Sequence, residues 1–253
     1  MTVVYEDEWV TLHHADYRDH LAGLRADAII TDPPYGETSL DWDQWPTGWL
    51  SDAAGITNAL WCFGSFRMFY EHAHEFRTIE PLWQLSQEIV WEKHNGSGFA
   101  NDRFKRVHEL AVLWYRGEWA NLRHETPTTA DATARTVRRK TRPVHTGTIN
   151  DSSYRSEDGG PRLMRSVQYV RSEHGRAIHP TQKPVGIVAP LIEYSVPPGG
   201  LVVDLFAGSA TTAVTARQMG RRCIAFEGRE DYAHRAAERL AQQTFIFPEG
   251  DAA

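Results

Sequence analysis

Four consecutive residues, Asp32-Pro33-Pro34-Tyr35, are the first candidates for chemistry in this sequence. Their two prolines fix φ and remove two N–H donors, so the segment is stiff and its carbonyl oxygens are free to accept hydrogen bonds. The Asp32 carboxylate and the Pro33 carbonyl could together accept both N–H bonds of an exocyclic amine, and the Tyr35 ring could stack on the base that carries it. The alternative without chemistry is a rigid turn with a packed tyrosine.

The amine of adenine is a poor nucleophile because its lone pair is delocalised into the ring. An enzyme that uses it as a nucleophile must hold the nitrogen in place with hydrogen bonds, and it needs no covalent nucleophile of its own. A base in duplex DNA reaches such a pocket only after it has rotated out of the stack. The tetrapeptide therefore predicts attack by an exocyclic nitrogen on an electrophilic methyl group.

A second motif occupies residues 202–212, where a strand runs into a tight turn of small residues and then into a helix. In doubly wound sheets a nucleoside-containing ligand binds at such a turn. Gly208 allows the backbone to approach the ligand, and Ser209, Thr211 or Thr212 can cap the helix. Glu227 ends the next strand, about where an acid meets ribose hydroxyls. Alone the turn is ambiguous, because it lacks a dinucleotide or Walker fingerprint.

The apolar pattern predicts the elements that hold these motifs in place. Runs at 10–14, 28–31, 58–63, 201–206 and 223–226 predict strands, and runs at 68–76, 185–194, 211–219 and 231–242 predict helices. Residues 17–24 predict a helical turn or two, residues 37–49 a loop, and residues 87–91 and 110–115 an antiparallel pair of strands. Strands that alternate with helices predict an α/β fold with a mostly parallel, doubly wound sheet and helices on both faces.

The charge is unevenly distributed along the chain. The formal net charge is −6, but residues 116–176 hold 12 Lys and Arg against 7 Asp and Glu, a net +5. This segment is rich in Thr, Ser, Arg and Gly and has no long predicted element. A basic block in an acidic body favours a local surface for phosphate contact, and a solvated polar loop is the alternative.

The remaining composition favours a cytoplasmic globular protein. No apolar run has the length of a membrane span, and the first residues lack the basic region of a signal peptide. Cys62 and Cys223 lie in apolar runs and are expected to be buried free thiols. The twelve histidines lack ligand spacing, so no metal site is expected. Trp42, Trp45 and Trp49 either stack on bases or close the site as a lid, and packing over the sheet edge is the alternative.

Together, the tetrapeptide, the later run His179-Pro-Thr-Gln-Lys183-Pro184 and the turn at 204–212 resemble the amino-methyltransferases of restriction–modification systems. Their order along the chain is similar to the permuted β class of that family. The resemblance implies a circularly permuted, Rossmann-like methyltransferase fold that uses S-adenosyl-L-methionine to methylate double-stranded DNA. It divides the chain into a catalytic half at 1–116, an inserted target-recognition region at 117–176 and a cofactor-binding half at 177–253.

The resemblance also assigns roles to individual residues. It implies base positioning and catalysis for the tetrapeptide, and it places Lys183 at the methionine end of the cofactor. The run from Trp91 to Arg116 resembles the family's active-site strands and hairpin. With the turn motif, the predicted cofactor-binding residues are Asp16, Lys183, Asp204, Phe206, Ala207, Gly208, Ser209, Thr211 and Glu227. The residues expected to contact DNA phosphates are Arg138, Arg139, Lys140 and Arg142.

Two departures from the family pattern and several alternatives accompany this interpretation. Leu205 stands where the family usually has Pro, and Ala210 stands where it usually has a second glycine, so its methyl could crowd the turn. Family members whose tetrapeptide begins with an acid, as this one does with Asp32, mostly methylate N6 of adenine. Methylation of cytosine N4 is the alternative. RNA or glutamine methylation is disfavoured by the motif order. A non-catalytic DNA-binding relative is the alternative outside the enzyme class. Family members are often dimers, so a homodimer is one candidate partner, and the resemblance to restriction–modification enzymes makes a cognate restriction nuclease another.

Overall fold

The computed structural model describes residues 2–78, 83–97, 101–138, 153–173, 175, 177–179 and 181–242. The chain forms two compact units. The larger unit consists of Met1–Glu125 and Ser166–Ala253, and the smaller one of Thr126–Arg165. The smaller unit falls within the segment 117–176 that the sequence predicts as an insertion.

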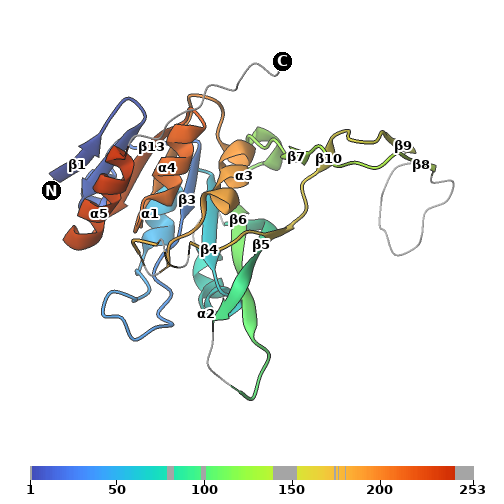
Figure 1. Cartoon of the computed structure of the whole chain (residues 1–253). Coiled ribbons are helices and arrows are strands. Elements are labelled where there is room, and N and C mark those ends of the chain that lie inside the picture. Colours follow the sequence, from blue (N-terminus) through green and yellow to red (C-terminus); the bar gives the residue numbers. More distant parts are fainter. Residues whose placement is uncertain are drawn as a thin grey trace. The chain divides into compact units, whose positions relative to one another are not determined.

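A mixed sheet of nine strands forms the centre of the larger unit (Figure 1). Five of its eight neighbouring pairs are parallel, and they include the central run β2-β13-β12-β3-β4. In sheet order the strands are β1 (Thr2–Glu6), β2 (Val10–His14), β13 (Arg222–Glu227), β12 (Leu201–Asp204), β3 (Ala28–Thr31), β4 (Ala59–Gly64), β6 (Arg106–Tyr115), β5 (Gln84–Ser97) and β11 (Val167–Tyr169). The predicted α/β fold with a mostly parallel sheet is therefore confirmed.

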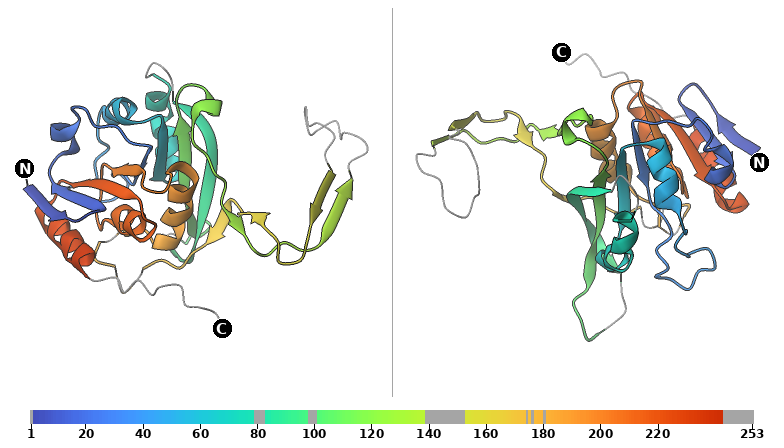
Figure 2. Two further views of the ribbon diagram at one scale, coloured as in Figure 1. Left: turned by 90° about the horizontal axis from the view of Figure 1, so that it is seen from above. Right: turned by 180° about the vertical axis from the view of Figure 1, so that it is seen from behind.

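Helices cover both faces of this sheet, as the left view of Figure 2 shows. Successive side chains of a strand point to opposite faces, so Ala28 and Ile30 of β3 pack into one core and Ile29 into the other. The first core is shared with α3 (Val185–Ser195), α4 (Thr211–Gln218) and α5 (Glu230–Ala241), and the second with α1 (Trp49–Ile56) and α2 (Phe66–Phe76). All four residues of β3 are buried, as expected for a strand covered on both faces.

The topology brings the two motifs of the sequence to one edge of the sheet. Strands β3, β12 and β13 are parallel neighbours, although about 170 residues separate β3 from β12 along the chain. Asp32 directly follows β3, Asp204 ends β12 and Glu227 ends β13. Because the carboxyl ends of parallel strands meet at the same edge, the tetrapeptide and the small-residue turn lie beside each other.

Several elements differ from the sequence prediction. The antiparallel pair is longer than expected, since β5 and β6 extend over 84–97 and 106–115. The predicted loop at 37–49 ends at α1, a short helix with a fully buried apolar face. Helix α2 begins at Phe66 because the Ser65 hydroxyl caps it and accepts the Met68 N–H at 3.0 Å. Residues 17–20 form a 3-10 helix.

The smaller unit contains two antiparallel pairs of short strands. The first joins β7 (Thr128–Thr129) to β10 (Arg162–Leu163), and the second joins β8 (Arg135–Arg138) to β9 (Ser153–Ser156). The lack of a long predicted element in this part of the sequence agrees with strands of two to four residues.

Both cysteines, Cys62 and Cys223, are free and buried, which confirms the expectation from sequence. Across the part of the chain that the structure describes, no helix is long and apolar enough to cross a membrane. In the same residues, no three His, Cys, Asp or Glu side chains gather in a way that could hold a metal ion.

Candidate active site

One cavity at the carboxyl edge of the sheet brings the predicted site residues together. The tetrapeptide forms one part of its wall, and the small-residue turn with the end of β13 forms another. Trp42, His179 and Tyr232 also line it. Of the predicted catalytic and cofactor-binding residues, those that line the cavity are Asp32, Pro33, Pro34, Tyr35, Lys183, Asp204, Phe206, Ala207, Gly208, Ser209, Thr211 and Glu227.

Among the predicted cofactor-binding residues, Asp16 alone is not part of the cavity wall that the structure describes. It follows β2, whose last residue His14 pairs with Glu227, so it lies near the same edge of the sheet. Its carboxylate accepts the Arg18 N–H at 3.0 Å and caps the 3-10 helix at 17–20. The assignment of Asp16 to the cofactor stays a prediction.

Glu227 forms the acidic part of the cavity wall. Its two carboxylate oxygens accept the Gly208 N–H at 2.7 Å and the Arg229 N–H at 2.8 Å, which fixes the side chain against the turn. Burial raises the pKa of Glu227 to about 7, although the two backbone N–H groups act in the opposite direction. The side chain is therefore an anchored acceptor whose charge changes near neutral pH.

Asp204 lies below the turn and joins the two sequence halves. It accepts the Thr31 hydroxyl at 2.7 Å and the Phe206 N–H at 3.2 Å, so it ties the end of β12 to the end of β3. Burial raises its pKa to about 6 against the effect of these hydrogen bonds. The Asp204 carboxylate thus positions the turn beside the tetrapeptide.

Ala210, the departure from the family's glycine, has a left-handed backbone conformation with φ +56°. An L-residue pays for this conformation with steric strain of about 1–2 kcal/mol. The residue is fully buried in the core shared with α3 and α4, and it is not among the residues that line the cavity. The methyl group therefore adds to the core and not to the cavity wall, and Ala210 burdens the turn through its backbone; its effect on cofactor affinity stays a prediction. Gly208, with φ +52°, occupies the cavity side.

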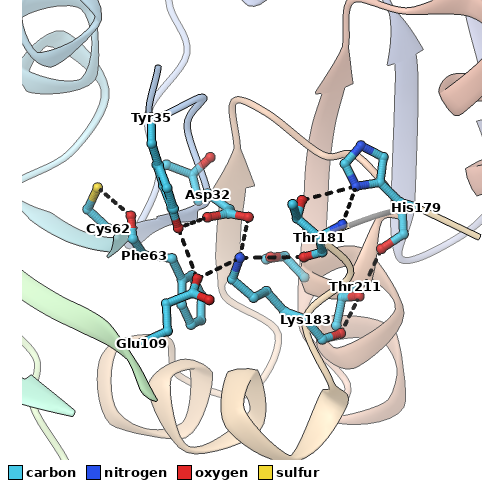
Figure 3. A network of polar contacts seen from close by, with 12 residues as sticks. Asp32, Tyr35, Cys62, Phe63, Glu109, His179, Thr181, Lys183 and Thr211 are labelled. Atoms are coloured by element: carbon cyan, nitrogen blue, oxygen red, sulfur yellow. Dashed lines mark hydrogen bonds and ion pairs between the residues drawn. The ribbon is translucent and has the colours of Figure 1, made fainter. Parts of the chain in front are cut away.

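A closed ring of polar contacts lies beneath the tetrapeptide (Figure 3). The Lys183 ammonium group bonds to Asp32 Oδ2 and to Glu109 Oε1, the latter at 2.8 Å. The Tyr35 hydroxyl donates to Asp32 Oδ1 and also lies 2.9 Å from Glu109 Oε1. Lys93 pairs with the other oxygen of Glu109 at 2.6 Å. The Lys183 ammonium group is thus engaged with the tetrapeptide, and its role at the methionine end of the cofactor stays a prediction.

The charges in this ring balance, with two carboxylates and two ammonium groups. Burial acts against ionisation of Glu109, but Lys183 and Lys93 outweigh it and lower its pKa to about 2. Burial raises the pKa of Asp32, and Glu109 adds to the shift while Lys183 opposes it. The pKa of Lys183 is raised, because the two carboxylates outweigh its burial. Glu109 is thus held as an anion and Asp32 is the more basic of the two carboxylates.

Sequence reasoning did not select Glu109 or Asp43 as site residues. Glu109 lies in the run 91–116 that resembles active-site strands, but no local pattern points to its contact with Lys183. Asp43 accepts the N–H groups of Tyr35 at 2.7 Å, Gly36 at 2.9 Å and Thr38 at 2.7 Å. Burial acts to raise its pKa, but these hydrogen bonds prevail and lower it. Asp43 therefore fixes the backbone that carries Tyr35.

The three tryptophans at 42–49 lie in different surroundings, and the expected stacking on bases stays a prediction. Trp42 lines the cavity beside His179, with ring centroids 5.5 Å apart. Trp45 stacks on His72 of α2 at 3.9 Å, and Trp49 is fully buried in the core. Burial lowers the pKa of His179 to about 4, and Lys183 adds to the effect. His179 is therefore a neutral ring in the cavity wall at physiological pH.

Most of the predicted phosphate-contacting residues lie outside the described residues. Arg139, Lys140 and Arg142 belong to this group, and Arg138 is the last residue of β8 in the smaller unit. Their contact with DNA stays a prediction.

The family comparison bears on the activity that this cavity supports. The DNA methylase family model, which covers N6 and N4 methyltransferases, matches residues 26–238 and so spans both halves and the segment between them. The chain belongs to this DNA methylase family. The tetrapeptide and the turn, which form one cavity here, both lie inside the matched region.

Two curated relatives are type II methyltransferases. M.ScaI of Streptomyces caespitosus is 26% identical over 261 aligned residues, which cover 93% of this chain and 83% of that protein. M.HinfI of Haemophilus influenzae is 25% identical over 215 residues, which cover 80% of this chain and 52% of that protein. This DNA methylase thus matches about half the length of M.HinfI.

Two solved structures share the fold. M1.HpyAVI in its SAM complex has a TM-score of 0.62 and 23% identity, and the match covers 91% of this chain and 100% of that one. The PvuII DNA methyltransferase, described as cytosine-N4-specific, has a TM-score of 0.62 and 16% identity, over 96% of this chain and 90% of that one. At these identities the likeness concerns the fold of the DNA methylase alone.

Proposed function

We propose that this DNA methylase transfers a methyl group from S-adenosyl-L-methionine to N6 of adenine, in a base rotated out of duplex DNA. The observation that carries the proposal is the shared cavity, in which the acid-first tetrapeptide lies beside the small-residue turn and Glu227. The cavity thus offers an acceptor for an exocyclic amine next to an acceptor for ribose hydroxyls. Family membership supports methyl transfer to DNA, and Asp32 favours adenine.

The residues of the turn fit the proposed cofactor. Gly208 gives a backbone without a side chain at the cavity wall, and the buried Glu227 carboxylate can accept hydroxyl donors beside it. Phe206 supplies an apolar surface for a planar ring. When bound there, S-adenosyl-L-methionine supplies an electrophilic methyl group on its sulfonium sulfur. In this proposal Glu227 binds the ribose, and Gly208 and Ser209 lie along the chain of the cofactor.

The tetrapeptide then acts on the base. Asp32 and the carbonyl oxygen of Pro33 accept the two N–H bonds of the amine, and Tyr35 stacks on the ring. The nitrogen forms a bond to the methyl carbon while the bond between that carbon and sulfur breaks, and the nitrogen then loses one proton. Asp32 is the group that accepts this proton, because burial raises its pKa and it is hydrogen-bonded to the same nitrogen. No covalent intermediate with the protein is needed.

We assign target recognition to the segment 117–176 and phosphate contact to Arg138, Arg139, Lys140 and Arg142, as the sequence predicts. Phosphate contacts position a protein on DNA, whereas base edges carry the sequence information. Substituting these four residues should weaken binding to all duplexes alike and reduce its salt dependence. A homodimer and a cognate restriction nuclease stay predictions from the family resemblance.

The proposed reaction is tested by incubating the protein with S-adenosyl-L-methionine labelled in its methyl group and unmethylated duplex DNA of diverse sequence. Enzymatic digestion and mass spectrometry of the nucleosides should yield labelled N6-methyladenine. Labelled N4-methylcytosine would instead establish the alternative base, and unlabelled DNA would refute methyl transfer.

A substitution at Asp32 tests the role of the tetrapeptide. Asp32→Ala should abolish labelling of DNA while calorimetry still detects binding of S-adenosyl-L-methionine, because Glu227 and Gly208 are untouched. The matched control is Asp41→Ala, which removes an exposed carboxylate from the neighbouring loop and should retain activity. If Asp32→Ala keeps its activity, the tetrapeptide does not position the amine.

A further inference from the structure

Both oxygens of the Asp32 carboxylate are already hydrogen-bonded in the structure. Oδ1 accepts the Tyr35 hydroxyl, and Oδ2 accepts the Lys183 ammonium group (Figure 3). The proposed reaction requires one of these oxygens to accept an N–H of the amine, and a carboxylate that is occupied by other donors is a weaker acceptor for it. Each carboxylate oxygen can accept a second donor, but release of one of the two present donors makes Asp32 a stronger acceptor for the amine when the base enters.

Tyr35 is the donor that can be released at little cost. Its hydroxyl has one hydrogen but two acceptors within reach, Asp32 Oδ1 and Glu109 Oε1, the latter at 2.9 Å. Rotation about the C–O bond moves this hydrogen from one acceptor to the other without moving the ring. Lys183 has three hydrogens, which serve Asp32 and Glu109 at the same time, and it must remain to balance their charges.

Glu109 is prepared for this exchange. Its side chain is 11% exposed, and Lys93 holds Oε2 at 2.6 Å, which leaves Oε1 facing Tyr35 and Lys183. Because the two lysines keep it ionised, its oxygen is a strong acceptor at neutral pH. It lies on β6, an internal strand of the sheet, and is thus held at a fixed distance from the tetrapeptide.

We propose that Glu109 is a positioning residue that takes over the Tyr35 hydroxyl when the base enters, so that Asp32 Oδ1 is free to accept the exocyclic amine. This inference rests on the proposed function. Because only a hydrogen moves, the Tyr35 ring keeps its place for stacking throughout. The ring of contacts thus occupies both oxygens of Asp32 before the base enters and releases Oδ1 only for a donor that competes with a phenol.

A series at position 109 measures the need for this acceptor. Glu109→Gln keeps a neutral oxygen and Glu109→Met removes every acceptor at similar size. Turnover at saturating S-adenosyl-L-methionine and unmethylated duplex DNA should fall in the order Glu, Gln, Met, with a loss of about tenfold or more for Met. KM for both substrates should stay within about twofold, since the amine engages Asp32 most strongly in the transition state.

The same series in a Tyr35→Phe background is the decisive measurement. Phenylalanine retains the stacking ring but has no hydroxyl to block Asp32, so the three residues at position 109 should then give turnover within about twofold of one another. If Glu109 served only to balance the charges of Lys183 and Lys93, the full loss would persist in this background. Persistence of the loss, or an absence of any effect in the first series, would overturn the inference.

Two controls distinguish the hydrogen exchange at Tyr35 from a general effect of substitution and from a failure of the proposed function. Glu88→Gln changes an exposed carboxylate on β5 outside the run 91–116 and should leave turnover and melting temperature unchanged. If Glu109→Met does not fold, the Glu and Gln forms compared with and without the Tyr35 hydroxyl give the same test. An inactive parent protein would instead refute the proposed function, whereas an active parent with unchanged losses in the Tyr35→Phe background refutes the exchange alone.

Discussion

Binding of S-adenosyl-L-methionine should weaken as the pH falls through about 7, because Glu227 must be ionised to accept two ribose hydroxyls. Burial against the turn raises the pKa of this carboxyl to about 7. The anion then makes up about nine tenths of the population at pH 8 and about one tenth at pH 6. Because binding requires the charged form in this proposal, affinity should accordingly fall about tenfold between these two values.

The same group predicts an opposite trend for the protein without ligand. Its pKa in the folded state lies above the ordinary value of 4.5, so the folded state holds the proton more tightly than the unfolded state. The stability contributed by Glu227 is therefore full below about pH 4.5 and is lost as the pH rises through 7, by up to about 3 kcal/mol. Over this window ligand affinity increases while the contribution to stability decreases.

Isothermal titration calorimetry in buffers of different ionisation enthalpy counts the protons that leave on binding. About 0.9 proton should be released at pH 6 and about 0.1 at pH 8. Glu227→Gln cannot titrate, so its proton release should be close to zero and its affinity flat over the same range. Equal proton release by the parent protein and this variant, or none at pH 6, would refute the assignment of Glu227 to the ribose.

Three other substitutions test how the site is supported. Ala210→Gly relieves left-handed strain of about 1–2 kcal/mol but removes a buried methyl worth about 0.8 kcal/mol. The free energy of unfolding, measured with denaturant, should therefore change by about 1 kcal/mol or less. Calorimetry should find an unchanged affinity for S-adenosyl-L-methionine. Asp43→Ala deprives three loop N–H groups of their acceptor and should lower the initial rate of DNA methylation by about tenfold, with a smaller loss for Asp43→Asn, which keeps one oxygen. Trp61→Phe leaves the buried Ser195 hydroxyl without its 2.8 Å donor and should cost about 1–3 kcal/mol of unfolding free energy, with no change in ligand affinity.

The chemistry of the site could be predicted because it is encoded in short runs of consecutive residues. Asp32 to Tyr35 form one stiff segment, and residues 204–212 form one turn, so their local structure needs little help from the rest of the chain. The strands that carry them are buried on both faces and appear in the sequence as apolar, β-branched runs. The sheet edge at which both end then follows from the parallel topology.

What could not be predicted depends on tertiary contacts. Glu109 gains its role from Lys183, which lies 74 residues later in the chain, and nothing in its own strand indicates that partner. Helix α1 escaped prediction because its residues are apolar on most sides and Gly55 lowers helix propensity. The burial of the Ala210 methyl also depends on the core beneath the turn, so a family pattern alone did not indicate its place.

The position of β12 and β13 in the middle of the sheet constrains how the chain can fold during synthesis. Strands β2 and β3 each hydrogen-bond along one edge to a strand from residues 201–227, so both edges stay open until those residues have left the ribosome. Closure of the sheet then requires contacts between residues about 170 positions apart, which slows folding. A nascent chain that stops before residue 200 would leave one open edge on each of these two strands, and open strand edges are prone to aggregate and to bind chaperones.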